Sequence, residues 1–109
     1  MSNTLTDDIG RYAEVLKALS NPSRLRLFLE IVECCPPGSD PRVDGCDLPN
    51  VGQLGGELEI APSTLSHHIK ELRRAGLVRC ERRGQQVECS VDEETLNGLA
   101  EFFQRFASE

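Results

Sequence analysis

The sequence lacks any apolar run that approaches the roughly 20 residues a helix needs to cross a bilayer. It also shows no signal peptide, with its charged start, apolar centre and small-residue cleavage site. These two absences argue against a membrane protein and against a secreted one. We therefore expect a cytoplasmic protein.

Catalytic motifs are missing as well. The 109 residues contain no recognisable nucleophile motif, glycine-rich phosphate loop or catalytic carboxylate pair. Cys46 beside Asp47, or Cys34 with a histidine, could in principle act as nucleophile and base. We nevertheless expect no enzymatic activity; turnover with a thiol donor would instead indicate a small reductase.

Basic residues are in the minority, because the formal net charge is −6. They are also concentrated: residues 63–83 hold six basic and two acidic side chains, a local balance of +4, which leaves −10 for the rest of the chain. An acidic body with one basic face orients a protein on nucleic acid and keeps its non-specific affinity weak. The charge pattern therefore predicts a DNA-binding face.

The length suits one domain spanning 1–109, and the apolar spacing predicts a mainly α-helical chain with one β-hairpin. Residues 34–50 contain four prolines and two glycines, which predicts a loop. The expected elements, in order, are helices at 5–19, 22–33, about 51–59 and 62–75, a hairpin at 77–91, and a helix at 92–107. Ser20 or Asn21 is expected to cap the second helix, ahead of Pro22 at its first position.

The helix at 62–75 carries the clearest functional signal. Leu65, Ile69 and Leu72 are four and three residues apart, which places them on one inward-facing stripe. The opposite face carries hydroxyls, an imidazole and long cations that suit base edges and phosphates: Ser63, Thr64, Ser66, His67, Lys70 and Arg74. An ordinary solvated face is the alternative. The hairpin that follows turns at Gly84 and presents Arg82 and Arg83 at its tip, as a DNA-contacting wing would.

The two terminal helices carry more apolar surface than so small a domain can cover. Their apolar stripes comprise Ile9, Tyr12, Ala13, Leu16 and Leu19 in the first, and Leu96, Leu99, Phe102, Phe103 and Phe106 in the last. We expect a homodimer formed through Tyr12, Leu16, Leu99, Phe102, Phe103 and Phe106, which would present two recognition helices to a palindromic double-stranded operator. The alternative is that both helices close the core of a monomer.

The stretches ALSNPSRLRLFLEI, STLSHHIKELRRAGLV and RRGQQVECSVDE resemble the ArsR–SmtB family of metal- and metalloid-responsive transcriptional repressors over nearly the whole chain. The resemblance implies a homodimeric winged helix-turn-helix that occupies its operator without inducer and leaves when inducer binds. It also implies DNA contacts from Ser63, Thr64, Ser66, His67 and His68, with Arg82 and Arg83 on the wing.

The five cysteines are the candidates for binding the inducer. In the reducing compartment that we expect, cysteines act as thiolate ligands or redox-active thiols more often than as structural disulfides. The family's cysteine site before the recognition helix and its Asp/His site on the last helix have no counterpart here. Cys34, Cys35 and Cys46 remain in the loop, and three thiolates suit arsenite or antimonite as inducer, without a permanent cofactor. Asp44 or Asp47 could complete a site for a divalent soft metal such as zinc, cadmium or lead. Thiol oxidants, persulfides and the absence of any sensing role also remain open, as does completion of the site across the dimer.

Cys80 and Cys89 form a separate pair. A two-residue turn at Gly84–Gln85 would place them directly opposite each other on the hairpin, close enough to bond or to share an ion. Packing as two small apolar residues is the interpretation we favour from the sequence.

Overall fold

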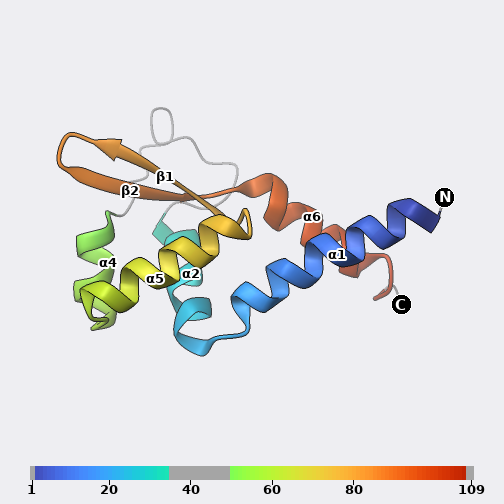
Figure 1. Cartoon of the computed structure of the whole chain (residues 1–109), viewed down its shortest axis with the longest axis horizontal. Helices are drawn as coiled ribbons and strands as arrows, with labels where there is room; N and C mark the ends of the chain where they lie inside the picture. The colour runs from blue at the N-terminus through green and yellow to red at the C-terminus, as the bar shows by residue number, and fades with distance from the viewer. Residues whose placement is uncertain (1, 35–49, 108–109) are drawn as a thin grey trace.

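The computed structural model describes residues 2–34 and 50–107. Along the chain the elements are α1 (Ser2–Leu19), α2 (Pro22–Cys34), α4 (Val51–Leu58), α5 (Pro62–Arg74), β1 (Val78–Arg83), β2 (Gln86–Val91) and α6 (Glu93–Gln104) (Figure 1). The two strands pair antiparallel, with Cys80 opposite Cys89 and a two-residue turn between Arg83 and Gln86. The expected helices and hairpin are therefore present, although α1 begins three residues earlier than the apolar pattern predicts.

Short polar contacts define where the helices begin. Asn21 caps α2, since its Oδ1 accepts from the backbone N–H of Arg24 at 3.0 Å. Asn50 and Gln53 form a reciprocal capping box at α4, and Asp92 accepts from the N–H of Thr95 at 3.1 Å at α6.

The core lies where α2, α4 and α5 meet the hairpin. Its fully buried side chains come from several elements and include Leu27, Ile31, Leu54, Leu72, Leu77 and Cys89. Helix α5 packs against β1, α1, α2 and α4, while β2 packs against α2 and α4. The loop expected at 34–50 is described only at its ends: Cys34 completes α2, and Asn50 bridges to Glu88 of β2.

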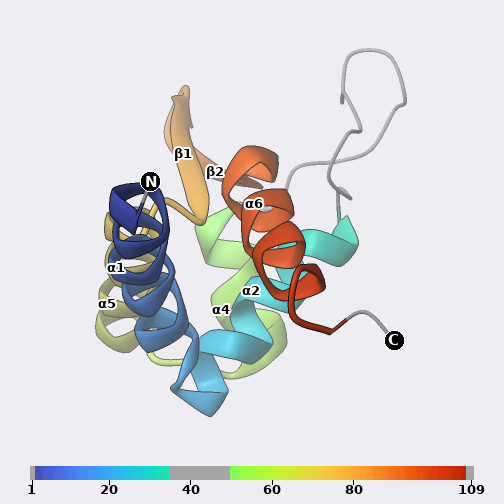
Figure 2. The same ribbon diagram turned by 90° about the vertical axis from the view of Figure 1, so that its right-hand side faces the viewer.

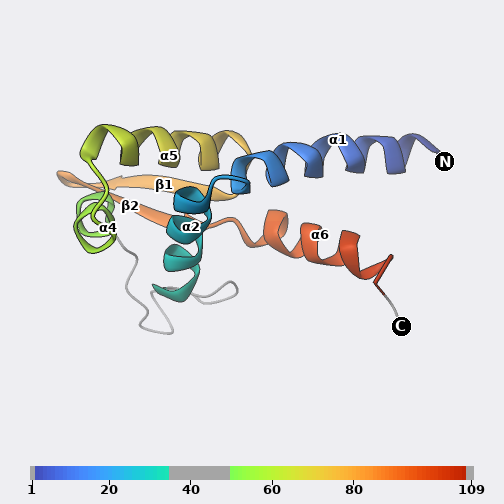
Figure 3. The same ribbon diagram turned by 90° about the horizontal axis from the view of Figure 1, so that it is seen from below.

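Helices α1 and α6 project together away from this core. Both chain ends lie at that side, opposite the turn of the hairpin, so the molecule is elongated, measuring 47 × 33 × 25 Å (Figures 1 and 3). Viewed from that end, α1 lies on the side of α5 and α6 on the side of α2 (Figure 2). None of the helices in the described ranges combines the length and apolar character that a membrane span requires.

The buried face of α1 differs from the stripe that the sequence predicts. The buried side chains are Tyr12, Val15 and Ala18, whereas Ile9 and Leu16 are 54% and 43% exposed. The stripe expected on α1 is therefore buried only in part, because only the last turns of α1 meet the body of the domain, where Val15 and Ala18 are buried beside Tyr12. In α6, Leu96, Leu99 and Phe102 are half-buried, while Phe103 and Phe106 are 46% and 65% exposed.

Candidate nucleic-acid interface

Helix α5 is held in place by its inner face. Leu65, Ile69 and Leu72 are all buried, which confirms the stripe predicted from their spacing. Pro62 occupies the first helical position, and the helix ends where Gly76 takes a φ of +79°. The N–H of Leu77 then donates to the carbonyl of Leu72 at 3.0 Å, which directs the chain into β1. Helix and hairpin are thus joined through a short turn with a fixed conformation.

The outer face of α5 is open to solvent. Its exposed polar residues are Ser63, Thr64, Ser66, His67, Lys70 and Arg74. The hydroxyls and His67 lie in the first two turns, while the cations lie towards the C-terminal end. Arg74 donates to Glu71 at 3.3 Å, but this exposed pair holds the guanidinium only weakly. The face therefore offers small hydrogen-bonding groups at one end and positive charge at the other.

His68 does not belong to this face, although the family resemblance assigns it a DNA contact. It is only 5% exposed, and its Nδ1 accepts from Nε of Arg24 at 3.4 Å. Arg24 in turn donates through Nη1 to the carbonyl of Ala18 at 3.1 Å. Burial, and then the positive charges of Arg24 and His67, lower the pKa of His68. His68 thus connects α5 to α2 and α1 as a neutral acceptor.

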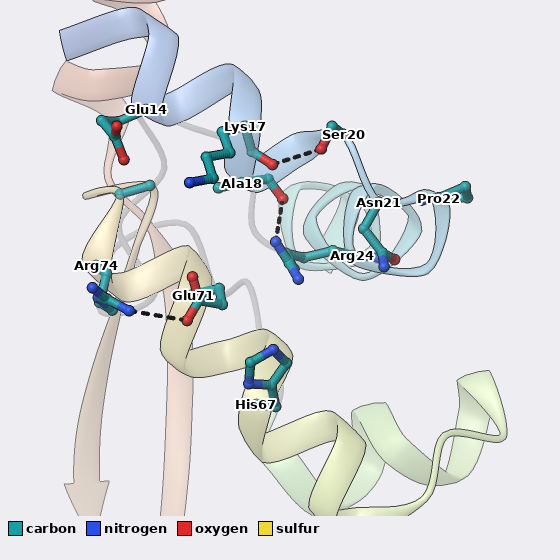
Figure 4. A pocket seen from close by; sticks show the side chains of 11 residues that line it. Glu14, Lys17, Ala18, Ser20, Asn21, Pro22, Arg24, His67, Glu71 and Arg74 are labelled. Atoms are coloured by element: carbon teal, nitrogen blue, oxygen red, sulfur yellow. Dashed lines mark hydrogen bonds and ion pairs between the residues drawn. The ribbon is translucent and has the colours of Figure 1, made fainter. Parts of the chain in front are cut away.

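Arg24 is a positioning residue that sequence reasoning missed. The usable signal was the position of His68, three residues after Leu65 and four before Leu72, which puts an imidazole at the edge of a buried stripe and requires a partner for it. A hollow lies between α5 and the junction of α1 and α2, and Figure 4 shows Arg24 on one side of it and His67, Glu71 and Arg74 on the other. Because its lining mixes carboxylates and cations, the hollow favours no ligand of a single charge.

The wing presents its cations at the tip, where Gly84 adopts a φ of +66° in the turn. Arg82 and Arg83 are exposed. Arg83 lies 3.5 Å from a carboxylate oxygen of Glu88 and 3.9 Å from one of Glu81, whereas Nε of Arg82 donates to the Gly84 carbonyl at 3.4 Å. Surface pairs of this kind exchange readily for a phosphate.

The root of the wing is tied to α6. Arg79 contacts Asp92 with N–O distances of 3.1 and 3.2 Å, and the N–H of Asp92 donates to the carbonyl of Leu77 at 2.8 Å. Burial raises the pKa of Asp92, but the hydrogen bonds from Thr95 and Arg79 outweigh it, so the pKa is lowered overall. The wing and the last helix are therefore coupled through one carboxylate.

The cysteines fall into two groups. Cys80 and Cys89 are opposite each other, as the two-residue turn predicted, with 3.5 Å between their sulfurs. Cys34 is half-buried at the end of α2, while Cys35 and Cys46 lie outside the described residues, as do Asp44 and Asp47. Within the described ranges, no three His, Cys, Asp or Glu side chains are grouped so that they could hold a metal ion.

Comparison with known proteins bears directly on this surface. A family model of bacterial regulatory proteins, the arsR family, matches residues 49–79, which include α4 and α5. The uncharacterized HTH-type transcriptional regulator YbzH of Bacillus subtilis (strain 168) is 37% identical over 93 residues, covering 82% of this chain and 91% of that protein. The chain belongs to the ArsR family.

Two further similarities agree with the family assignment. The arsenical resistance operon repressor of Bacillus subtilis (strain 168) is 29% identical over 99 residues, covering 91% of this chain and 83% of that one. The structure of reduced HlyU from Vibrio cholerae N16961 matches with a TM-score of 0.67 at 24% identity, covering 97% of this chain and 98% of that one. The winged helix-turn-helix predicted from the sequence is confirmed, with α5 directly before the hairpin.

Proposed function

We propose that this ArsR-family regulator is a homodimeric repressor that binds a palindromic operator and releases it when arsenite or antimonite binds cysteine thiolates. DNA binding is supported by the connection between the exposed face of α5 and the cationic tip of the wing, which are joined through the short turn at Gly76 and Leu77. We call Ser63, Thr64, Ser66, His67, Lys70, Arg74, Arg82 and Arg83 the DNA surface. His68 is left out of it because it is buried against Arg24.

The two ends of the DNA surface suit different parts of a duplex. The first turns of a recognition helix enter the major groove, where hydroxyls and an imidazole read base edges. Lys70 and Arg74, further along α5, are long enough to reach phosphates, and Arg82 and Arg83 suit the backbone or the minor groove beside it. Sequence readout therefore depends on the start of α5, and most of the electrostatic affinity depends on the cations.

This division is tested with two single variants. His67→Ala should reduce the preference for a duplex selected by the protein over random DNA by about 1–3 kcal/mol, the value of one good base contact. Arg83→Ala should weaken binding to both duplexes and make the slope of log affinity against log salt shallower by about one. Arg26→Ala removes an exposed cation of α2 outside the DNA surface and should leave both quantities close to those of the parent. Equal losses from His67→Ala and Arg83→Ala on both duplexes would refute this docking.

Dimerisation is supported by apolar side chains that the domain itself leaves uncovered. Leu5, Ile9 and Leu16 of α1, and Phe103 and Phe106 at the end of the chain, are each 39–65% exposed. Tyr12 and Phe102 link the two helices, with ring centroids 5.0 Å apart. A second copy would cover this surface and supply the second recognition helix that a palindromic operator requires.

The surroundings of Cys34 disfavour an anionic inducer. Burial, and then the negative charges of Glu30, Glu57 and Glu33, raise the pKa of this thiol and disfavour its thiolate. The same carboxylates repel anions, but arsenous acid is uncharged at neutral pH. Each thiol that binds it replaces one hydroxyl and releases one water, so no net charge has to enter the site.

The position of Cys34 also suggests how binding is transmitted. The segment that follows it rejoins the described fold at Asn50, which bridges to Glu88 of the wing strand and caps α4. An inducer held by Cys34, Cys35 and Cys46 would tie the end of α2 to this junction and change the spacing of the two recognition helices. A hundredfold loss of operator affinity requires the inducer to favour the DNA-free form by about 2.7 kcal/mol.

The inducer is tested by titrating operator-bound, reduced protein with arsenite, antimonite, zinc, cadmium and a persulfide donor in parallel. Cys35→Ser and Cys46→Ser should bind operator normally and ignore arsenite, whereas Cys80→Ser and Cys89→Ser should respond like the parent. Normal release by arsenite in Cys46→Ser, or loss of release in Cys80→Ser, would move the site to the wing. Release by zinc or cadmium alone would replace the metalloid with a divalent metal.

A further inference from the structure

The two cysteines of the wing are arranged as a reactive pair. Their sulfurs are 3.5 Å apart, so forming a disulfide requires an approach of only about 1.5 Å. Counted from the two-residue turn, Cys80 and Cys89 are the fourth cross-strand pair. In an antiparallel ladder that closes with a hydrogen-bonded pair, the fourth is a non-hydrogen-bonded pair, whose side chains approach most closely. The strands therefore already hold both sulfurs near bonding geometry.

The two thiols differ in access. Cys89 is fully buried in the core, while Cys80 is half-exposed. Cys80 lines a hollow between the C-terminal half of α5 and β1, together with Val78 and four cationic side chains: Lys70, Arg73, Arg74 and Arg79. One sulfur thus faces solvent in a positively charged setting, and its partner lies behind it, out of reach of any reagent.

The electrostatics agree with this division of roles. The side-chain hydrogen bond from Cys89 lowers the pKa of Cys80 to about 7, burial opposes this shift, and the charge of Arg73 adds to it. The same hydrogen bond and burial raise the pKa of Cys89. At neutral pH the thiolate therefore forms more readily at Cys80 than at Cys89.

We propose that Cys80 and Cys89 form a redox-active dithiol in the wing, in which Cys80 attacks anionic low-molecular-weight disulfides and Cys89 resolves the adduct. The cations around Cys80, of which Arg74 also pairs with Glu71 and Arg79 with Asp92, select for negative charge on the reagent. This is the chemistry of a carboxylate-bearing peptide disulfide such as glutathione disulfide. This site is separate from the loop cysteines of the proposed inducer site, and its chemistry does not depend on operator binding.

The reaction proceeds by two thiol–disulfide exchanges. The Cys80 thiolate attacks one sulfur of the disulfide, forming a mixed disulfide and expelling one thiolate. The Cys89 sulfur then attacks Sγ of Cys80, expels the second thiolate and gives up its proton to it. Two protein thiols are oxidised to one Cys80–Cys89 disulfide, and one external disulfide is reduced to two thiols.

The modification lies beside the DNA surface. Lys70 and Arg74 belong both to that surface and to the hollow around Cys80. A mixed disulfide would place the negative charge of the reagent among these cations, so this adduct should bind DNA less tightly than the reduced protein.

The test uses the full chain with Cys34, Cys35 and Cys46 replaced by serine, so that only the wing thiols remain. Treatment with glutathione disulfide should yield, by intact mass and peptide mapping, a single Cys80–Cys89 disulfide that dithiothreitol reverses. Cys89→Ser in this background should stop at a glutathione adduct on Cys80. Cys80→Ser should stay unmodified until the chain is unfolded with urea.

Reaction rates distinguish a thiol activated by its surroundings from an ordinary exposed thiol. The second-order rate should rise with pH to a plateau, with a midpoint near 7. Arg73→Ala should slow the reaction with glutathione disulfide several-fold but leave that with uncharged bis(2-hydroxyethyl) disulfide nearly unchanged. First modification at Cys89, adducts that never close, or equal effects of Arg73→Ala on both reagents would overturn the proposal. Circular dichroism serves to check that each variant is folded. DNA affinity of the untreated protein, measured separately, reports only on the proposed repressor function.

Discussion

The exposed aromatic rings at the end of the chain give a quantitative test of dimerisation. Phe103 is 46% exposed, and a phenylalanine side chain offers roughly 200 Å² of surface, so about 90 Å² remains to be covered. At about 25 cal/mol per Å² this surface is worth roughly 2 kcal/mol in each chain and about 4 kcal/mol in a symmetric dimer. Phe103→Glu should therefore raise the dimer dissociation constant about a thousandfold if the ring is fully covered, and about thirtyfold if half is covered.

The assay is sedimentation equilibrium over a wide range of protein concentrations, with operator binding measured on the same samples. Because Phe103 is exposed within one chain, the variant should keep the parent's circular dichroism spectrum and unfolding midpoint at low concentration. Asn97→Glu makes the same change in charge at an exposed position about 120° around α6, and it should dimerise like the parent. A Phe103→Glu protein that remains dimeric, or a monomer with full operator affinity, would refute the assembly we propose.

Three further predictions concern the stability of the unit that carries the DNA surface. Leu72→Ala, at a fully buried position of α5, should lower the free energy of unfolding in urea by about 2–5 kcal/mol, whereas Leu25→Ala, at a 39% exposed position, should lower it far less. Asp92→Asn should lower the free energy of unfolding at neutral pH. Because the pKa of Asp92 is lowered in the folded state, the stability difference between parent and variant should be present above about pH 4 and should disappear as the pH falls through the folded-state pKa. Burial lowers the pKa of His68 in the folded protein, so His68 is protonated more readily in the unfolded chain. The parent should therefore lose stability relative to His68→Gln as the pH falls below about 6.5. A stability difference between the two proteins that stays constant across that pH range would contradict the neutral role of His68.

Local pattern was sufficient for much of the fold. The spacing of Leu65, Ile69 and Leu72, the cap expected at Ser20 or Asn21, and the turn at Gly84–Gln85 each depend on a few neighbouring residues. The structure confirms all three, with Asn21 as the cap. The register of the hairpin follows from the turn length alone, so the approach of Cys80 to Cys89 could also be predicted.

Features that depend on contacts distant in sequence could not be predicted in this way. His68 and Arg24 are 44 residues apart, and only the packing of α5 on α2 shows that the imidazole is an acceptor in the interior instead of a DNA contact. Which apolar residues of α1 are buried could not be predicted for a related reason. Periodicity shows that a helix has an apolar side, but which turns of the helix meet the domain depends on where α2 and α5 lie.

The partial burial of the apolar surface of α1 has a physical meaning. A helix whose apolar residues exceed what its own domain covers will show two apolar faces: Tyr12, Val15 and Ala18 satisfy the core, while Ile9 and Leu16 remain outside it. The surplus would be a liability in a monomer, because exposed apolar patches associate. At the end of the molecule away from the DNA surface, the same surplus can join two copies and leave both recognition helices free (Figure 3). In the dimer that we propose, the second apolar face of α1 would therefore matter as much as the polar face of α5, since a single half-site forfeits the contacts that the second copy would supply.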